Sequence, residues 1–231
     1  MIIAKRKKQK KNYIRKQSLL CYFGERFNVC FFESCFIFRS LIIKESIGGV
    51  ILSDFTTNRK EEDLDLSSII ISESDSDIIK IRDAPNAGGS SIYSEVLSFL
   101  ILKKCCHAKL LKTEMEIEYF PRGGPITDYV CQIYGTILGV SVSRAMKFGS
   151  RAYTEEDAKR LLHKKLKGVI KSTNNNQEKW KKQVLHLWSV SNDVTSTLIK
   201  VFNMIPPEIK SNTVILITTT VKTFNLIYLN K

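Results

Sequence analysis

Glu95 is the first residue in the sequence whose chemistry needs an explanation. It lies in a predicted helix that begins at Ser90 or Ser91, runs to about Lys104 and is apolar over most of its circumference. A carboxylate on a helix that its neighbours bury costs free energy unless it is hydrogen-bonded, paired or bound to a cation. Glu95 is therefore a candidate metal ligand, and a buried hydrogen bond to nearby backbone is the alternative.

A row of cations on a second predicted helix is the next candidate. Four basic side chains recur at helical spacing after Thr154, opposite an apolar stripe, namely Arg160, Lys164, Lys167 and Lys171. Such a row can bind the phosphates of a nucleic acid, and a solvated helix face is the alternative. The whole chain is basic, with 36 Lys and Arg against 23 Asp and Glu and a formal charge of +13, which favours phosphate polymers or anionic lipid as partners.

These side chains need a scaffold, and the pattern after Ser90 predicts a mixed α/β domain. Three short segments of alternating or β-branched residues, joined by short turns, predict an antiparallel meander, and a helix, a strand, a helix and a strand follow. In chain order we expect a helix over 91–104, strands over 113–119, 127–134 and 137–146, a helix that starts at 154, a strand over 184–190, a helix over 194–203 and a strand over 214–221.

The order α-β-β-β-α-β over residues 88–190 resembles the core of the PD-(D/E)XK nuclease superfamily, the restriction-endonuclease-like fold. In this family the first helix often contributes a Glu, which would be Glu95 here. The second strand begins with an Asp after a Pro-containing turn, and in the stretch GGPITDYV the matching residue is Asp128. The resemblance implies a nuclease in which carboxylates hold Mg²⁺, and in which the ion activates water and offsets the charge on the phosphate.

The third strand departs from the family pattern, which is an acidic residue, one spacer and a Lys. This chain has Ser141-Val142-Ser143 and then Arg144 at that place. One of Glu114, Glu116 or Glu118 could replace the acid, and Arg144, Lys164 or Lys165 the lysine; loss of catalysis is the other interpretation.

The resemblance assigns residues to three roles. The catalytic residues are Glu95, Asp128 and Arg144, and the metal ligands are Asp128, Glu95 and Glu116. Two alternatives stay open, because an Asp between a turn and a strand often caps backbone amides, and because glutamates along a strand often protect a sheet edge. The residues expected to bind nucleic acid are Arg144, Lys147, Arg160, Lys164, Lys167 and Lys171.

Charge divides the chain into three regions. Residues 1–46 carry 11 basic and 3 acidic side chains, residues 47–84 carry 4 and 9, and residues 85–231 carry 21 and 11. We therefore expect a basic and then apolar N-terminal segment (1–46), an acidic linker rich in Ser and Ile (47–85) and the nuclease-like domain (86–231). The N-terminal segment is expected to be poorly ordered or to lie outside the fold.

The basic run at residues 5–16 predicts a nuclear import signal or a nucleic-acid-binding arm, with a disordered charge run as the alternative. We expect a nuclear protein, or otherwise a cytoplasmic one. A membrane span over the apolar residues 19–43 is not expected, because Glu25, Arg26 and Arg39 are among the charges that interrupt it. A peripheral membrane anchor is the weaker hypothesis for this segment.

The acidic region contains a short motif that resembles a SUMO-interacting motif. A β-branched run can add as a strand to the edge of a partner's sheet, and the acidic tail SESDSD can meet a basic rim. A plain acidic linker is the alternative. The residues expected to bind the partner are Ile69, Ile70, Ile71, Ser72 and Glu73, with the tail ending at Asp77.

Two functions from different classes follow. The first is a nucleic-acid-binding protein with a PD-(D/E)XK-like core that is either a divergent Mg²⁺-dependent phosphodiesterase or catalytically degenerate, with DNA or RNA as its partner. The second is a non-enzymatic nuclear scaffold that docks SUMO-like proteins. A zinc site is not predicted, because no two of the 6 Cys residues have CxxC spacing.

Overall fold

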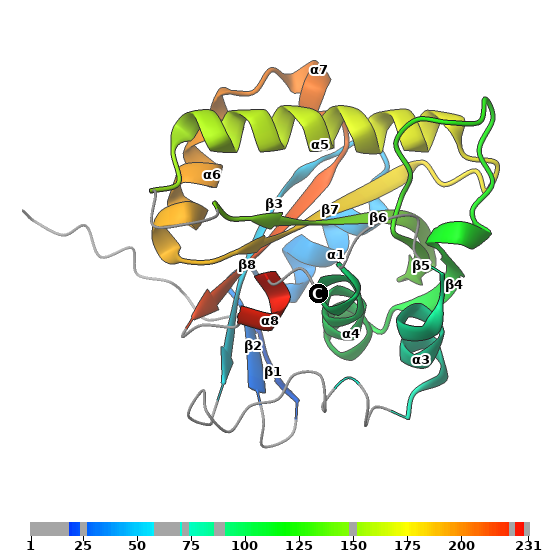
Figure 1. Cartoon of the computed structure of the whole chain (residues 1–231), viewed down its shortest axis with the longest axis horizontal. Coiled ribbons are helices and arrows are strands. Elements are labelled where there is room, and N and C mark those ends of the chain that lie inside the picture. Colours follow the sequence, from blue (N-terminus) through cyan, green and yellow to red (C-terminus); the bar gives the residue numbers. More distant parts are fainter. Residues whose placement is uncertain are drawn as a thin grey trace, which may run out of the picture.

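One mixed sheet of eight strands organises the part of the chain that the structure describes (Figure 1). The structure is a computed structural model, and it describes residues 19–23, 27–57, 70, 74–85, 91–147, 152–221 and 225–228. The strand order across the sheet is β1-β2-β3-β8-β7-β6-β5-β4. The strands are β1 (Leu19–Phe23), β2 (Phe27–Phe31), β3 (Gly49–Thr57), β4 (Lys109–Thr113), β5 (Tyr129–Ile133), β6 (Thr136–Ala145), β7 (Lys182–Ser189) and β8 (Val214–Val221).

Helices cover both faces of this sheet (Figure 1). One face packs against α1, α3, α4 and α8, and the other packs against α5 and α6. The helical segments are α1 (Cys35–Ile43), α3 (Ser76–Asp83), α4 (Ile92–Cys106), the short turn η2 (Glu114–Glu116), α5 (Glu155–Asn175), α6 (Asn192–Met204), α7 (Pro207–Lys210) and α8 (Asn225–Tyr228). The expected α/β class is therefore confirmed.

Strand direction changes from the middle of the sheet to its edges. The four central strands β3, β8, β7 and β6 run parallel, whereas β4 with β5, β5 with β6, β1 with β2 and β2 with β3 pair antiparallel. The central strands are buried on both faces, as is usual for parallel strands, and in β7 Val184 and Trp188 face one core while Leu185 and Leu187 face the other.

The expected strand over 113–119 is wrong, because the chain turns at its first residue. β4 ends at Thr113, and residues 114–116 form η2. The Glu116 carboxylate accepts hydrogen bonds from the backbone N–H of Thr113 at 2.8 Å and from its hydroxyl at 3.2 Å. This capping box fixes a helical turn, and the alternating Glu residues that suggested a strand edge belong to the turn and the segment after it.

The sheet also crosses the domain boundaries that charge predicted. Residues 49–56 of β3 pair in parallel with residues 214–221 of β8, so that a strand from the expected linker lies in the middle of the sheet. β2 joins β3 with the buried side chains Phe27, Val29 and Phe31. The expectation that residues 1–46 lie outside the fold is therefore wrong for β1, β2 and α1, and the expected linker contributes β3 and α3 to the fold.

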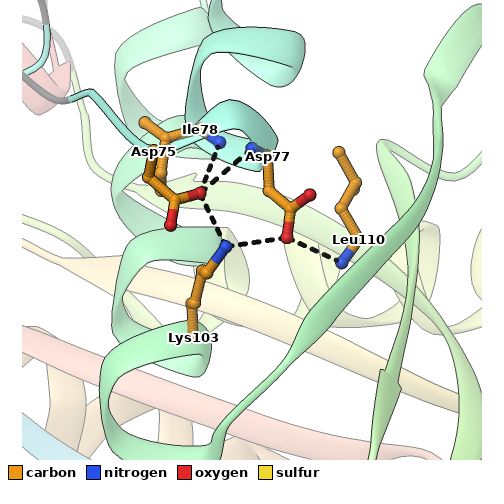
Figure 2. Close-up of polar contacts among 5 residues, drawn as sticks. All are labelled: Asp75, Asp77, Ile78, Lys103 and Leu110. Carbon is orange, nitrogen blue, oxygen red and sulfur yellow. Dashed lines mark hydrogen bonds and ion pairs between the residues drawn. The ribbon is translucent and has the colours of Figure 1, made fainter.

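An ion-pair cluster attaches α3 to α4 (Figure 2). The Lys103 ammonium contacts Asp75 Oδ1 at 2.6 Å and Asp77 Oδ2 at 2.8 Å. The same Asp75 oxygen caps α3 by accepting from the backbone N–H of Asp77 at 3.0 Å and of Ile78 at 3.4 Å. Burial opposes ionisation of Asp75, but Lys103 and these N–H groups outweigh burial and lower its pKa.

We expect Lys103→Met to lower the free energy of unfolding by about 1–2 kcal/mol, because both aspartates then keep their charge without a cation. Met retains the aliphatic length of the side chain, so the change isolates the ammonium. Urea unfolding measures the difference. The exposed neighbour Lys104 provides the control Lys104→Met, and equal effects of the two changes would show that the cluster does not stabilise the packing of α3.

Candidate functional site

A pocket of about 450 Å³ opens where α4, the loop before β5, strand β6 and α5 meet. Carboxylates from α4, from η2 and from the loop before β5 line it, and β6 and α5 contribute cations. The charged and hydroxyl side chains that line it are Ser91, Ser94, Glu95, Glu114, Asp128, Ser141, Ser143, Arg144, Lys164 and Lys165. The structure therefore brings together all three residues expected to be catalytic, which lie far apart in the sequence.

Asp128 lies immediately before β5, and strand β6 fixes its position. Its backbone N–H donates to the carbonyl of Val140 at 3.1 Å, and its Oδ2 accepts from the backbone N–H of Val142 at 2.6 Å. The carboxylate thus bonds a backbone amide of the neighbouring strand, which is the capping role that the sequence left open.

Burial raises the pKa of Asp128 to about 8, and the negative charge of Glu95 adds to this rise. The N–H of Val142 and the ammonium of Lys165 act in the opposite direction. Two carboxyl groups this close cannot both ionise cheaply, so near neutral pH the pair holds a proton unless a cation replaces it.

Glu95 is 5% exposed, and α4 holds it against the sheet. Its Oε1 accepts a hydrogen bond from the Ser91 hydroxyl one turn earlier on the same helix. The sequence alternatives for Glu95 were a hydrogen bond to backbone or a metal. The structure shows a side-chain partner at Ser91, while the carboxylate also lines the pocket beside Asp128.

Arg144 contributes a half-buried cation from the end of β6. Burial lowers the pKa of its guanidinium, and the nearby charge of Glu95 counteracts this. One of its NH groups donates to the carbonyl of Ile227 in α8 at 3.4 Å. The guanidinium is therefore placed between the acidic side of the pocket and the C-terminal helix.

Ser141 and Ser143 lie on β6, at the positions where the resemblance stated above would expect an acid and a lysine. The register pairs Tyr129 with Val140, so Ser141 lies across from Asp128, and its side chain is 5% exposed. A serine hydroxyl is a weak ligand for Mg²⁺ beside a carboxylate. Lys165 of α5 supplies a cation to the same pocket from a different element.

The carboxylates of Glu95 and Asp128 suit a metal ion that needs few ligands from the protein. Within the described ranges no group of three or more His, Cys, Asp and Glu side chains could hold a metal ion. Magnesium commonly uses one or two carboxylates together with substrate phosphates, and Glu95 with Asp128 meets that requirement. Glu116 does not belong to this set, because it caps η2 and pairs with Lys80 at 2.8 Å.

The expected nucleic-acid-binding cations divide into two groups. Lys147 and Arg160 both pair with Asp157, at 2.8 and 3.2 Å, and the Lys147 ammonium is the largest cause of the low pKa of that carboxyl. Asp157 therefore offsets part of the charge of the row that the sequence predicted to bind phosphates. Lys164, Lys167 and Lys171 are exposed on α5 and form no ion pair within the described part of the chain.

The residues expected to dock SUMO-like partners are mostly outside the described residues, namely Ile69, Ile71, Ser72 and Glu73. Ile70 is described and lies in the hydrophobic core, 2% exposed. Asp75 and Asp77 of the acidic tail bind Lys103 of the same chain (Figure 2). Docking by strand addition would have to release Ile70 and both aspartates from these contacts.

The sequence treated residues 122–125 only as a turn, but this loop forms part of the pocket wall. Gly124, Pro125 and Ile126 line the pocket. A Cβ on Gly168 of α5 would lie 3.5 Å from Pro125, which shows how closely the loop packs on the helix. The two glycines in the loop and the Gly at position 168 of an amphipathic helix were the signals available in the sequence.

Comparison with known proteins gives a similarity in sequence but no family. No protein-family model matches the chain. A protein of Dictyostelium discoideum described as "AAC-rich mRNA clone AAC4 protein" is 38% identical over 202 residues, which is 84% of this chain and 28% of the relative. The chain thus spans little more than a quarter of the relative's length. No helix in the described ranges is long and apolar enough to cross a membrane.

Proposed function

We propose that this chain is a nucleic-acid-binding protein with a PD-(D/E)XK nuclease-like core whose cleavage site is degenerate. The observation that carries the proposal is the pocket in which Glu95 and Asp128 meet Arg144, Lys164 and Lys165. Carboxylates and cations converge in this way where a divalent ion and a phosphodiester bind side by side. In such a site Glu95 and Asp128 would hold Mg²⁺, which would offset charge on the bound phosphate.

The order and direction of the elements support the same proposal. α4, β4, β5, β6, α5 and β7 follow one another in the chain, with antiparallel pairing from β4 to β6 and parallel pairing of β6 with β7. Two of the three acids that line the pocket, Glu95 and Asp128, lie at elements where the resemblance expects them, the first helix and the start of the second strand.

The hydroxyls of Ser141 and Ser143 support degeneracy over cleavage. A serine in place of the acid removes one charge that would hold the ion, and a serine in place of the lysine removes the cation beside the attacking water. Glu114, one candidate to replace the acid, also lines the pocket, but within the described residues it forms no three-carboxylate group with Glu95 and Asp128 that could hold a metal ion. Lys165 lies on α5, from which its ammonium reaches Asp128 electrostatically. Its position favours neutralisation of a bound phosphate.

Charge reversal on α5 tests the binding of nucleic acid. We expect Lys164→Glu with Lys167→Glu to weaken binding of labelled DNA and RNA at least tenfold and to lower the salt slope, the dependence of log K on log salt, by about 2, because two phosphate contacts are lost. Fluorescence anisotropy over a range of salt concentrations measures both. Lys104→Glu with Lys109→Glu, at exposed positions away from the pocket, is the matched control.

Two results would contradict this part of the proposal. One is wild-type protein that binds neither DNA nor RNA, and the other is a control pair that weakens binding as much as the α5 pair does. Cleavage is scored separately with Mg²⁺ and Mn²⁺. We expect no cleavage from wild type. If wild type cleaves and Asp128→Asn abolishes the cleavage, the protein is a divergent phosphodiesterase and its site is not degenerate.

A further inference from the structure

We infer that the loop of residues 118–126 is a base-binding element and that the nucleic acid bound at the pocket is single-stranded, with one base stacked on Phe120. This inference rests on the proposed function and specifies its substrate class. Phe120 is 75% exposed, one of the most exposed large apolar side chains in the described part of the chain. Single exposed apolar residues are common, so the inference depends on how this one is held and what surrounds it.

The backbone of Phe120 is fixed by the end of α5. Its N–H donates to the carbonyl of Asn175 at 2.8 Å, and the N–H of Gln177 donates to the carbonyl of Glu118 at 2.9 Å. Tyr119 forms an antiparallel bridge with Asn176 between these two bonds. The exposed ring therefore stands on a rigid base, which lowers the entropy lost when a base stacks on it.

Tyr119 anchors the loop on its inner side. Its ring packs edge-on against Trp180, with the ring centroids 6.3 Å apart, and its hydroxyl accepts from the backbone N–H of Thr127 at 2.8 Å. Ile117 is buried against the same Trp180. Residues 117 and 119 thus face inward, which leaves Phe120 directed away from the core and ties the loop to the residue just before Asp128.

Two cations, Arg122 and Lys171, lie at the loop that carries Phe120, and the loop also contains the exposed acid Glu118. Arg122 is exposed two residues later and forms no ion pair within the described ranges. A Cβ on Gly124 would lie 3.4 Å from the side chain of Lys171, so the loop rests on the basic face of α5. An aromatic ring interleaved with cations is the arrangement that binds single strands, because the cations take phosphates while the ring takes a base.

The loop leads from Phe120 directly to the pocket. Gly124, Pro125 and Ile126 line the pocket. Phe120 lies four positions before Gly124, so their Cα atoms are at most ~14 Å apart. That length corresponds to about four nucleotides at the duplex spacing of ~3.4 Å per strand. A strand whose backbone lies on Lys171 and Arg122 can therefore reach both the ring and the carboxylate pair.

A base inside a duplex cannot stack on Phe120, because both of its faces are covered by neighbouring pairs, and only the two terminal pairs of a blunt duplex have a free face. The inference thus predicts a preference that charge alone does not produce. Anisotropy is measured with one oligonucleotide of about 20 nucleotides, longer than the ~4–16 that a single-strand-binding module occupies, as a single strand and as a blunt duplex. The variants are Phe120→Ala, Phe120→Leu and Phe120→Trp, with Phe36→Ala, an 80% exposed Phe on α1, as the matched control.

We expect Phe120→Ala and Phe120→Leu to weaken single-strand binding about 5- to 100-fold, Phe120→Trp to retain it, and Phe36→Ala to leave it unchanged. Duplex binding should change less than twofold in all four. Leu keeps the apolar volume without an aromatic face, so it separates stacking from packing, and circular dichroism checks that each variant is folded.

The outcomes separate this inference from the proposed function. Wild-type protein that binds no nucleic acid would overturn the proposed function and the inference with it. Wild-type binding that Phe120→Ala and Phe120→Leu leave intact, or that they weaken equally for single strand and duplex, would overturn the inference alone. The inference is supported if Phe120→Ala and Phe120→Leu weaken binding of the single strand but not of the duplex, and if Phe120→Trp retains binding of the single strand.

Discussion

Replacing Asp128 by Asn is expected to stabilise the metal-free protein, by on the order of 2–4 kcal/mol more at pH 8 than at pH 5. The carboxyl has a pKa of about 8 in the folded chain, raised by burial and by the charge of Glu95, against about 3.9 in the unfolded chain. Between these values the folded state binds a proton that the unfolded state has released. Stability therefore falls as the pH rises from about 4 to about 8.

Asn removes this titration and keeps the local structure. Its amide oxygen can accept from the backbone N–H of Val142 as Asp128 does, and its neutral NH₂ group faces the Glu95 carboxylate without repulsion. The measurement is urea unfolding at several pH values in chelator. Asp193→Asn, at an exposed position on α6, is the control and should not reproduce the pH-dependent gain.

Addition of Mg²⁺ then distinguishes a cation site from a pair that only shares a proton. A cation that binds the folded state alone raises the unfolding midpoint. We expect this rise for wild type and not for Asp128→Asn. A gain in stability that is the same at pH 5 and pH 8 would contradict the shared proton, and an equal Mg²⁺ effect on both proteins would contradict cation binding by this carboxylate pair.

The sequence predicted the helices and strands after residue 86 best where hydrophobic periodicity and a cap agreed. The helix after Thr154 has an apolar stripe and a Thr154–Asp157 capping box, and the structure has both. The strand ending at Thr113 was missed because the alternating Glu114, Glu116 and Glu118 mimic a strand. The capping box formed by Glu116 decided the local conformation, and its side chain could have been recognised from the spacing Thr113-x-x-Glu116.

The first three strands could not be placed from their own pattern. β3 is a parallel strand in the middle of the sheet, and its burial depends on β8, which lies more than 150 residues later in the chain. Local composition could not reveal that partner, and the acidic residues that follow β3 made the region resemble a linker. Pairing between distant segments is a property of the whole chain, which a window of residues does not contain.

The sequence predicted which residues form the candidate site better than it predicted the contacts that their side chains make. Glu95 and Asp128 were singled out by burial and by resemblance, and they do line one pocket. Glu116 was assigned to the metal, but the turn that it caps directs it to Lys80. The opposing faces of α5 were read from periodicity alone, so the pairing of Arg160 with Asp157 one turn earlier was missed.

A buried chain of hydrogen bonds across the core, also missed in the sequence, lies next to Glu95 and Asp128. His186 on β7 lies at its centre, with Nδ1 2.7 Å from the Ser98 hydroxyl and Nε2 2.8 Å from the Thr218 hydroxyl. Further hydrogen bonds join the Ser98 hydroxyl to the Tyr129 hydroxyl at 2.7 Å and the Thr218 hydroxyl to the Ser53 hydroxyl at 2.8 Å. Ser98 lies one turn after Glu95 on α4, and Tyr129 follows Asp128, so these bonds hold the helix with one acid against the strand with the other.

We expect His186→Leu to lower the free energy of unfolding by about 2–3 kcal/mol at pH 7, because two buried hydrogen bonds are lost. Burial lowers the pKa of His186 to about 3, against about 6.5 in the unfolded chain, so the folded state resists protonation and wild-type stability falls as the pH drops below about 6.5. Leu does not titrate, and the difference between the two proteins should therefore shrink by on the order of 2 kcal/mol between pH 7 and pH 5.

Urea unfolding at these two pH values measures the effect, and His163→Gln on α5 is the control for a His outside the chain of hydrogen bonds. If the network positions the acids, His186→Leu should also reduce the pH-dependent gain that Asp128→Asn produces, since a loosened α4 moves Glu95 away from Asp128. The two changes would then be non-additive in a double-mutant cycle. Strict additivity of the two changes, or a His186→Leu effect that does not depend on pH, would show that the hydrogen bonds around His186 do not hold Glu95 and Asp128 in place.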